Sequence, residues 1–301
     1  MTTLRIVSLN LGWQLSAEHK RMQRRVLLDT DSDLVVLQEA RRLDLVPELL
    51  EGFSWCEHSL SPSTHPAVLG IAIFGRNGVE RLDRHQLARS AFENEEVYPE
   101  LARWFHERHL GLDLRLPGGA ALRVLGAHAT PGSSEGPGTP TGRLGVGPRK
   151  AWFHTRVARW IADWTGPYVL ALDANTPRRE TLDPAATEFH IPISLDGTGQ
   201  RGEDVLLGEP PLRPHRARDL WRAWLDSAPG RSLRDGVPAE GPLAQSHHTG
   251  GRWYRYDHLW ATPELVPEAM AYRHDEAVSD HARIEARLAL GPSPAFSATD
   301  R

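Results

Sequence analysis

The short apolar runs of this sequence are repeatedly followed by polar side chains that can bind a metal ion or move a proton. Carboxylate and amide oxygens suit hard cations such as Mg²⁺ and Mn²⁺, and an unperturbed imidazole titrates near neutral pH. Side chains of these types stand at or beside the ends of the runs, at Asn10, Glu39, His128, Asp173, Asn175, Asp257, Asp280 and His281. If the fold brings them together, they can hold a divalent cation and transfer a proton.

Each of these residues also has an ordinary structural explanation. Asn10 and the segment after Asp173 could form turns, and His128 could be a hydrogen-bonded core histidine. Asp280 and His281 could be a surface dipeptide. Glu39 is harder to explain in this way, because a carboxylate at the border of an apolar run needs a partner or a metal. So many such positions in one chain favour a common site over unrelated coincidences.

The runs themselves have the length and composition of strands. They cover residues 4–9, 34–37, 68–74, 122–127, 168–172, 256–261 and 282–288, and several are apolar enough to be buried on both faces. Residues 19–29, 150–164 and 217–225 carry apolar side chains at helical spacing. Strands and helices that alternate along the chain predict a layered α/β domain, in which strand ends converge on one rim.

Two stretches look like long loops. Residues 130–148 are rich in glycine, proline, serine and threonine, and residues 177–214 are punctuated by proline, with a short strand candidate at 204–207. No linker separates two self-sufficient cores. We therefore predict one catalytic domain over residues 1–291, followed by a flexible tail at 292–301.

The polar residues lie in short motifs whose order along the chain is informative. These motifs are Ser8-Leu9-Asn10, Leu37-Gln38-Glu39, Gly126-Ala127-His128, Leu172-Asp173-Ala174-Asn175, Arg255-Tyr256-Asp257 and Ser279-Asp280-His281. In this order, each beside a predicted strand, they resemble the endonuclease/exonuclease/phosphatase superfamily, which includes deoxyribonuclease I-like and exonuclease III-like proteins. Two departures exist. The usual Gly-Asp-Phe-Asn is Leu-Asp-Ala-Asn here, and the Arg-x-x-Gln pattern of the following helix is not recognisable in residues 149–164.

The resemblance implies a four-layer α/β sandwich with two central mixed β-sheets flanked by helices. It also implies a phosphoester hydrolase that depends on Mg²⁺ or Mn²⁺ bound by Glu39 with Asn10 and Asp280. Asp173 would orient or deprotonate the attacking water, while Asn175 and His128 would hold phosphate oxygens. His281 would act as general acid/base or phosphate-stabilising group, with Asp257 bound to its other ring nitrogen. Whether Asp173 or His281 handles the nucleophile is left open.

Composition limits the class of protein further. The chain has 301 residues, a formal net charge of −4 and one cysteine, Cys56, which excludes an internal disulfide or a cysteine-cluster metal site. A slightly acidic chain argues against a protein that grips polyanions non-specifically. There is no window of about 20 apolar residues, and the N-terminus lacks a signal-peptide pattern. We expect a soluble, cytoplasmic, monomeric protein without a membrane partner.

The substrate is the least determined feature. A nuclease acting on DNA or RNA is our first hypothesis, and a phosphatase or phosphodiesterase on a nucleotide, inositol phosphate or lipid head group is the second. An inactive binding relative is the third, weakened because no expected catalytic side chain is missing. Cations near the motifs could bind phosphate, although solvated charge explains them equally well. These candidates are Arg143, Arg149, Lys150 and Arg178.

Overall fold

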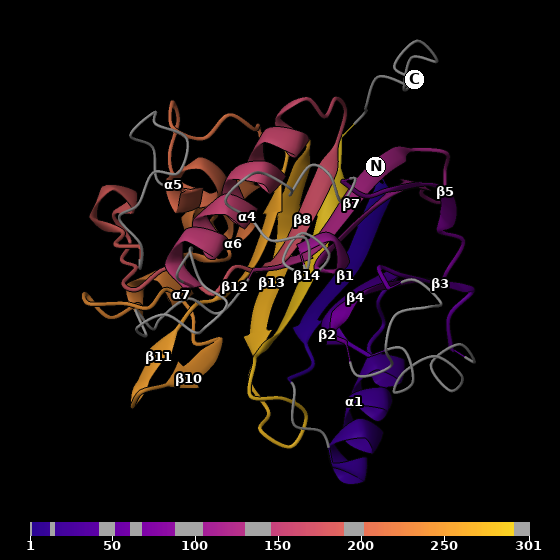
Figure 1. The fold of residues 1–301 in the computed structure, drawn as a ribbon, viewed down its shortest axis with the longest axis horizontal. Coiled ribbons are helices and arrows are strands. Elements are labelled where there is room, and N and C mark those ends of the chain that lie inside the picture. Colours follow the sequence, from indigo (N-terminus) through magenta and orange to yellow (C-terminus); the bar gives the residue numbers. More distant parts are fainter. Residues whose placement is uncertain are drawn as a thin grey trace.

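Two six-stranded sheets form the centre of the protein in a computed structural model, which describes residues 2–12, 16–41, 52–60, 68–87, 105–129, 146–189 and 202–291 (Figure 1). In spatial order, the first sheet contains β13 (Leu265–Arg273), β14 (Arg283–Leu290), β1 (Thr2–Asn10), β2 (Leu34–Ala40), β4 (Gly70–Gly75) and β3 (Trp55–His58). The second contains β5 (Glu80–His85), β6 (His109–Arg115), β7 (Ala121–His128), β8 (Tyr168–Asp173), β12 (Asp257–Ala261) and β9 (Arg218–Asp219).

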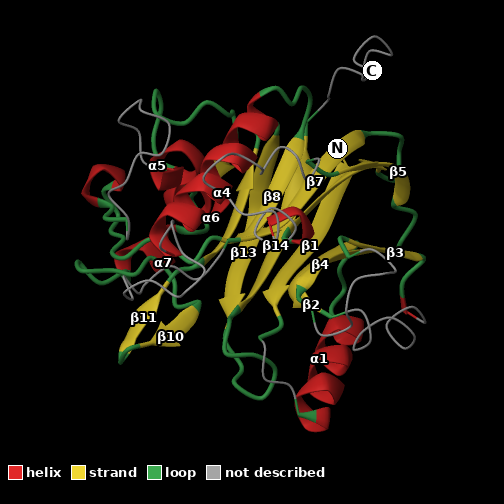
Figure 2. Cartoon of the chain, viewed as in Figure 1, coloured by secondary structure: helices red, strands yellow, loops and turns green. Residues whose placement is uncertain are grey.

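Both sheets are mixed. β1 is parallel to β2, and β7 is parallel to β8, whereas the other neighbouring strands in each sheet are antiparallel. The described helices are α1 (Ala17–Asp29), α4 (Val146–Ala162), α5 (Gly202–Leu207), α6 (Leu220–Asp226), α7 (Arg231–Asp235) and the 3-10 helix η3 (Pro184–Ala186). Figure 2 shows α1 apart from the other helices, and a separate hairpin of β10 (His247–Thr249) and β11 (Arg252–Tyr254).

Three apolar cores separate the four layers. The strands alternate between cores with a period of two, as a pleated strand buried on both faces must. In β1, Leu4 and Ile6 join the core between the sheets, whereas Val7 and Leu9 join a core that contains Leu27 of α1. The third core lies between the second sheet and α4. The predicted four-layer sandwich is therefore confirmed.

The predicted strands match β1, β2, β4, β7, β8, β12 and β14, and the three predicted helices match α1, α4 and α6. The strand predicted at 204–207 is wrong, because this segment is the buried helix α5. Gly202 allows α5 to approach α4 closely, since a Cβ at this position would overlap the carbonyl oxygen of Ala151. Residues 130–145 and the predicted tail at 292–301 lie outside the described residues. None of the described helices is both long and apolar enough to cross a membrane.

Candidate active site

The strand registers bring the predicted residues to one rim. His128, at the end of β7, is paired with Asp173 at the end of the parallel strand β8. Asp257, at the start of the antiparallel strand β12, is paired with the same Asp173. In the other sheet Asn10 is paired with Gln38, so that Glu39 follows directly. Three neighbouring strands of one sheet and two of the other therefore contribute to a single site.

Glu39 occupies an irregular position in β2. The β2–β4 register shifts between Leu37 and Ala40, and Glu39 has a φ of 56°, a left-handed conformation that is uncommon for a non-glycine residue. Its Oε1 lies 3.4 Å from Nε2 of His128, and its buried Oε2 has no hydrogen-bond partner among the described residues. Burial raises the pKa of Glu39, and the charges of His281 and Arg108 oppose this rise. A buried carboxylate oxygen without a partner is a natural ligand for a cation.

Asn10 connects Glu39 to the second sheet. It is fully buried, its Nδ2 donates to Oδ2 of Asp173 at 2.7 Å, and its Oδ1 accepts from the backbone N–H of Gly12 at 2.9 Å. The Asn10 amide also lowers the pKa of Glu39, against the effect of burial. Asn10 thus forms the turn that its sequence context allows through Gly12, and its amide also donates to Asp173 across the site.

His128 is buried beside an arginine that sequence reasoning missed. Arg108 precedes β6, and its Nη1 lies 3.0 Å from Nδ1 of His128. Burial and the charge of Arg108 lower the pKa of His128 well below its usual value, so the imidazole is neutral. Nη1 of Arg108 also lies 3.3 Å from Nε2 of His128, and this Nε2 lies 3.4 Å from carboxylate oxygens of both Glu39 and Asp173. Arg108 lies in a polar stretch that does not follow one of the predicted apolar runs. For this reason no sequence pattern indicated it.

Asp173 lies at the centre of the site. Burial raises its pKa to about 7; the positive charge of His281 opposes this rise, and the charges of Asp257 and Glu39 add to it. Its Oδ1 accepts from the backbone N–H of Asn175 at 3.0 Å. Asn175 has a φ of 51°, and its Nδ2 donates to the carbonyl oxygen of Ala129 at 2.9 Å. The Asp173 turn predicted from sequence therefore exists, and it also points functional groups into the site.

His281 and Asp257 form a carboxylate–histidine pair. Nδ1 of His281 lies 2.8 Å from Oδ2 of Asp257, and both side chains are almost fully buried. Burial lowers the pKa of His281, but Asp257 outweighs this effect and raises it to about 10. The ligand atoms of Asp173, Asp257 and His281 all lie within 4.8 Å of one another. The imidazolium is thus held beside two carboxylates in a single cluster.

Two serines and a glycine fix the backbone around this pair. Ser279 Oγ donates to the carbonyl oxygen of Asn10 at 2.7 Å and accepts from the N–H of His281 at 3.0 Å. Ser246 Oγ accepts from the N–H of Asp257 at 3.1 Å. Gly12 is in the left-handed region with a φ of 72°, and a Cβ there would lie 2.7 Å from Oδ1 of Asp280. Asp280 itself is exposed, so its carboxylate lies at the open side of the cluster.

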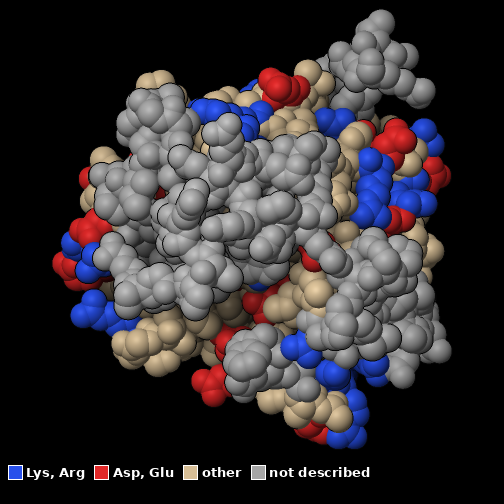
Figure 3. All heavy atoms as spheres, viewed as in Figure 1, with Lys and Arg blue, Asp and Glu red and all other residues tan. Residues whose placement is uncertain are grey.

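The basic side chains predicted to bind the substrate lie in different surroundings from one another where the structure describes them. Lys150 is fully buried, where its ammonium pairs with Glu203 at 3.0 Å and donates to the carbonyl oxygen of Asn175. This position corrects the prediction that Lys150 faces the substrate, because a buried paired ammonium is not open to a phosphate. Arg178 is exposed, and Arg143 and the side chain of Arg149 lie outside the described residues. Figure 3 shows basic and acidic side chains interspersed along the margin of one face.

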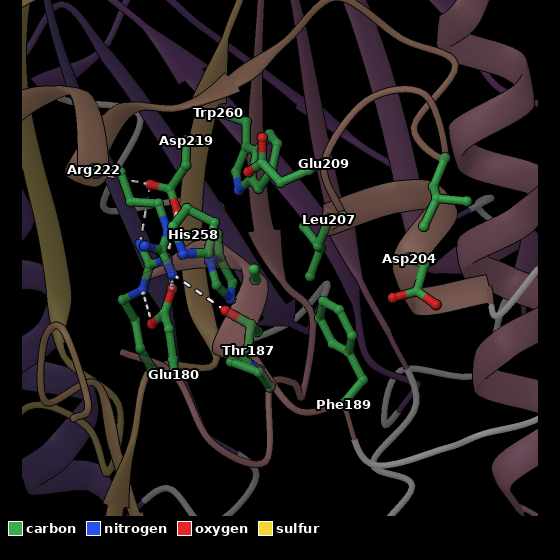
Figure 4. A pocket seen from close by; sticks show the side chains of 16 residues that line it. Glu180, Thr187, Phe189, Asp204, Leu207, Glu209, Asp219, Arg222, His258 and Trp260 are labelled. Atoms are coloured by element: carbon green, nitrogen blue, oxygen red, sulfur yellow. Dashed lines mark hydrogen bonds and ion pairs between the residues drawn. The ribbon is translucent and has the colours of Figure 1, made fainter. Parts of the chain in front are cut away.

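Arg255, two residues before Asp257, anchors the start of β12 through buried ion pairs. Its guanidinium donates to Glu180 Oε2 at 2.7 Å and to Asp219 Oδ1 at 3.1 Å, and Arg222 also donates to Glu180. Asp219 in addition caps α6 by accepting from the N–H of Trp221. In Figure 4, Glu180, Asp219 and Arg222 face one another along one wall of a pocket of about 190 Å³.

Replacing Arg255 by methionine is expected to lower the free energy of unfolding by about 3–5 kcal/mol, because it leaves two buried carboxylates with too little positive charge. Urea unfolding followed by circular dichroism measures this change. Arg252→Met, at an exposed arginine of the neighbouring hairpin, is the control and should unfold close to the wild type. Equal stability of the two variants would contradict the structural role given to Arg255.

The fold is that of the endonuclease/exonuclease/phosphatase proteins, in agreement with the resemblance of the sequence motifs. A Bacteroides vulgatus protein described as an endonuclease/exonuclease/phosphatase is 15% identical, with a TM-score of 0.60 over 97% of this chain and 100% of the other. D. rerio TDP2 in complex with a single-strand DNA product is 14% identical, with a TM-score of 0.57 over 96% and 100%. The human Nocturnin catalytic domain with bound sulfate is 13% identical, with a TM-score of 0.59 over 96% and 95%. No protein-family model and no curated protein matches the sequence significantly.

Proposed function

We propose that this protein is a divalent-metal-dependent phosphoester hydrolase. The observation that carries the proposal is the buried Oε2 of Glu39, which has no hydrogen-bond partner among the described residues and lies in the same site as the Asp257–His281 pair. Phosphoester hydrolysis requires that the negative charge of the phosphate be neutralised, that a water be aimed at phosphorus, and that the leaving oxygen be stabilised. The site offers a separate group for each requirement.

The donor set fits Mg²⁺ or Mn²⁺. Glu39, Asn10 and Asp280 provide oxygen atoms and no thiolate, which suits a hard cation better than Zn²⁺. Glu39 would be the main ligand, with Asn10 and Asp280 as direct ligands or as hydrogen-bond partners of metal-bound water. A cation bound there would supply charge neutralisation and acidify a water molecule.

The remaining residues divide the proton and charge chemistry. His281 is held as an imidazolium by Asp257 through Nδ1, so its Nε2–H can donate to a phosphate oxygen or to the leaving oxygen. A charged imidazole cannot also accept a proton, which favours Asp173 as the group that orients and deprotonates the attacking water. The neutral His128 and the amide of Asn175 would donate hydrogen bonds to the other phosphate oxygens.

A nuclease substrate is the first choice for this site. TDP2, which has the same fold, is known in complex with a single-strand DNA product, and this supports a nucleic acid as the substrate class. The second choice is a small phosphorylated molecule, which agrees with the burial of Lys150 away from any long phosphate backbone. A non-catalytic binding role is disfavoured, because each proposed catalytic side chain among the described residues has a partner suited to its task.

A substrate panel tests the proposal directly. We expect the purified protein with Mg²⁺ or Mn²⁺ to hydrolyse at least one member of a panel of plasmid DNA, single-stranded DNA, RNA and phosphomonoesters. EDTA should abolish this activity, and added Mg²⁺ should restore it. Hydrolysis that persists unchanged in EDTA would contradict the metal-dependent mechanism. The pattern of cleaved substrates decides between nuclease and phosphatase.

A further inference from the structure

A stack of aromatic rings ends on the face of His281. The ring of His247 lies 4.3 Å from that of His281, measured between centroids, with an interplanar angle of 26°. His247 also stacks on Tyr256 at 5.7 Å and 27°, and Tyr256 stacks on Tyr254 at 5.0 Å and 19°. These four rings come from the β10–β11 hairpin, from the start of β12 and from the segment before β14.

The backbone holds His247 firmly in this position. Residues 247 and 281 form an isolated antiparallel bridge, and the N–H of Ala282 donates to the carbonyl oxygen of Ser246 at 2.6 Å. Ser246 Oγ also accepts from the N–H of Tyr256 at 2.8 Å. Nδ1 of His247 lies 3.2 Å from the carbonyl oxygen of Asp280, which can only accept, so this nitrogen carries a proton. The His247 residue is therefore held by its backbone, by one ring nitrogen and by stacking against Tyr256.

His247, Asp280 and His281 also lie close enough to suggest a second metal site. The ring geometry argues against it, because the nitrogen lone pairs of two nearly parallel stacked rings run side by side and do not converge on one ion. In addition, Nδ1 of His247 and Nδ1 of His281 are both engaged in hydrogen bonds. The geometry is that of a flat packing surface.

We propose that His247 is a positioning residue, whose ring, supported by Tyr256 and Tyr254, holds His281 in the orientation in which Asp257 accepts its Nδ1 hydrogen bond. The Asp257 bond constrains the ring of His281 at one edge but leaves rotation about that bond free. Packing against a flat face removes this remaining freedom. Nε2 of His281 then points in one direction, which is the condition for efficient proton donation.

The inference rests on the proposed hydrolase function, and two substitutions separate stacking from other roles. His247→Ala removes the packing surface, whereas His247→Phe keeps a flat ring without nitrogens. We expect His247→Ala to lower kcat by about 10-fold with little change in KM, and His247→Phe to recover most of the loss. The substrates are p-nitrophenyl thymidine 5′-phosphate and a labelled single-stranded oligonucleotide, each with Mg²⁺. His248→Ala is the matched control, since this neighbouring ring is exposed and contacts Trp253.

A second measurement does not depend on activity. The Nδ1 proton of His281, shared with Asp257, should give a strongly downfield-shifted NMR resonance in the wild type and in His247→Phe. This resonance should be broadened or lost in His247→Ala, while thermal unfolding remains cooperative. If the wild type hydrolyses nothing, the proposed function fails but the resonance still tests the stacking. The inference is overturned if His247→Ala keeps the resonance and the kcat of the wild type. It is also overturned if His247→Phe is as slow as His247→Ala and has a raised KM.

Discussion

Replacing Glu39 by glutamine is expected to reduce Mg²⁺-dependent hydrolysis by at least about 10³-fold, because a metal ion supplies several kcal/mol of transition-state stabilisation and each 1.36 kcal/mol is a factor of ten. The amide is nearly the same size as the carboxylate, but it has no charge with which to hold the cation. The measurement is initial rate against Mg²⁺ concentration, together with metal binding by calorimetry.

The fold should survive this substitution. Oε2 of Glu39 is buried and has no hydrogen-bond partner among the described residues, and burial outweighs the neighbouring charges in raising the pKa of Glu39, so in the absence of metal its charge costs stability. Thermal unfolding in EDTA should therefore show a variant at least as stable as the wild type. Glu80→Gln, at an exposed glutamate of β5, is the control for the change of charge. Near-normal turnover by Glu39→Gln at low Mg²⁺ would remove Glu39 from the metal site.

Replacing His281 by alanine is expected to lower kcat by about 10²–10⁴-fold, the range that a well-placed acid–base group contributes. It also leaves Asp257 buried without its positive partner, so the variant should be less stable at neutral pH. Asp257→Asn tests the pair more gently, because the amide can keep a hydrogen bond to Nδ1 while the charge that favours the imidazolium is lost.

The pH dependence separates these two variants. Asp257→Asn should lower the pKa of His281 from its raised value. As the pH rises, the loss of activity should therefore begin at a lower pH in Asp257→Asn than in the wild type. Rates measured from pH 6 upward on the same substrate show this shift. Asp226→Asn, at an exposed aspartate at the end of α6, is the control. An unchanged kcat in His281→Ala would exclude this residue from the mechanism.

The polar residues at the rim could be predicted because each follows an apolar run, and strand ends converge wherever parallel strands share a sheet. β1, β2, β7 and β8 are buried on both faces, so their sequences are almost continuously apolar and easy to recognise. β5 is exposed and polar along most of its length, and β13 is an edge strand interrupted by Pro267, so neither shows the same pattern. Burial on both faces is thus what made a strand visible in the sequence.

The neighbours of these residues were beyond prediction for a related reason. Arg108 and His247 belong to the site through tertiary contacts with His128 and His281, and their local sequences resemble ordinary polar segments. Lys150 shows the opposite error. Its charge suggested exposure and phosphate binding, but Glu203 of a helix not predicted from sequence compensates it in the interior. Pairing of buried charges across distant elements is not visible in a local pattern.

The hydrogen bond from Ser279 to the carbonyl oxygen of Asn10 joins the two ends of the domain at the site. β1 pairs on one edge with β2 and on the other with β14, which is the last of the described strands along the chain. During synthesis, more than 270 residues must therefore be added after β1 before β14 exists and can pair with it. His281 and its contact with Asn10 arrive in the same late step, and contacts of such long range form slowly. A nascent or C-terminally truncated chain thus lacks the completed site, and we expect the proposed hydrolysis to begin only after β14 has been added.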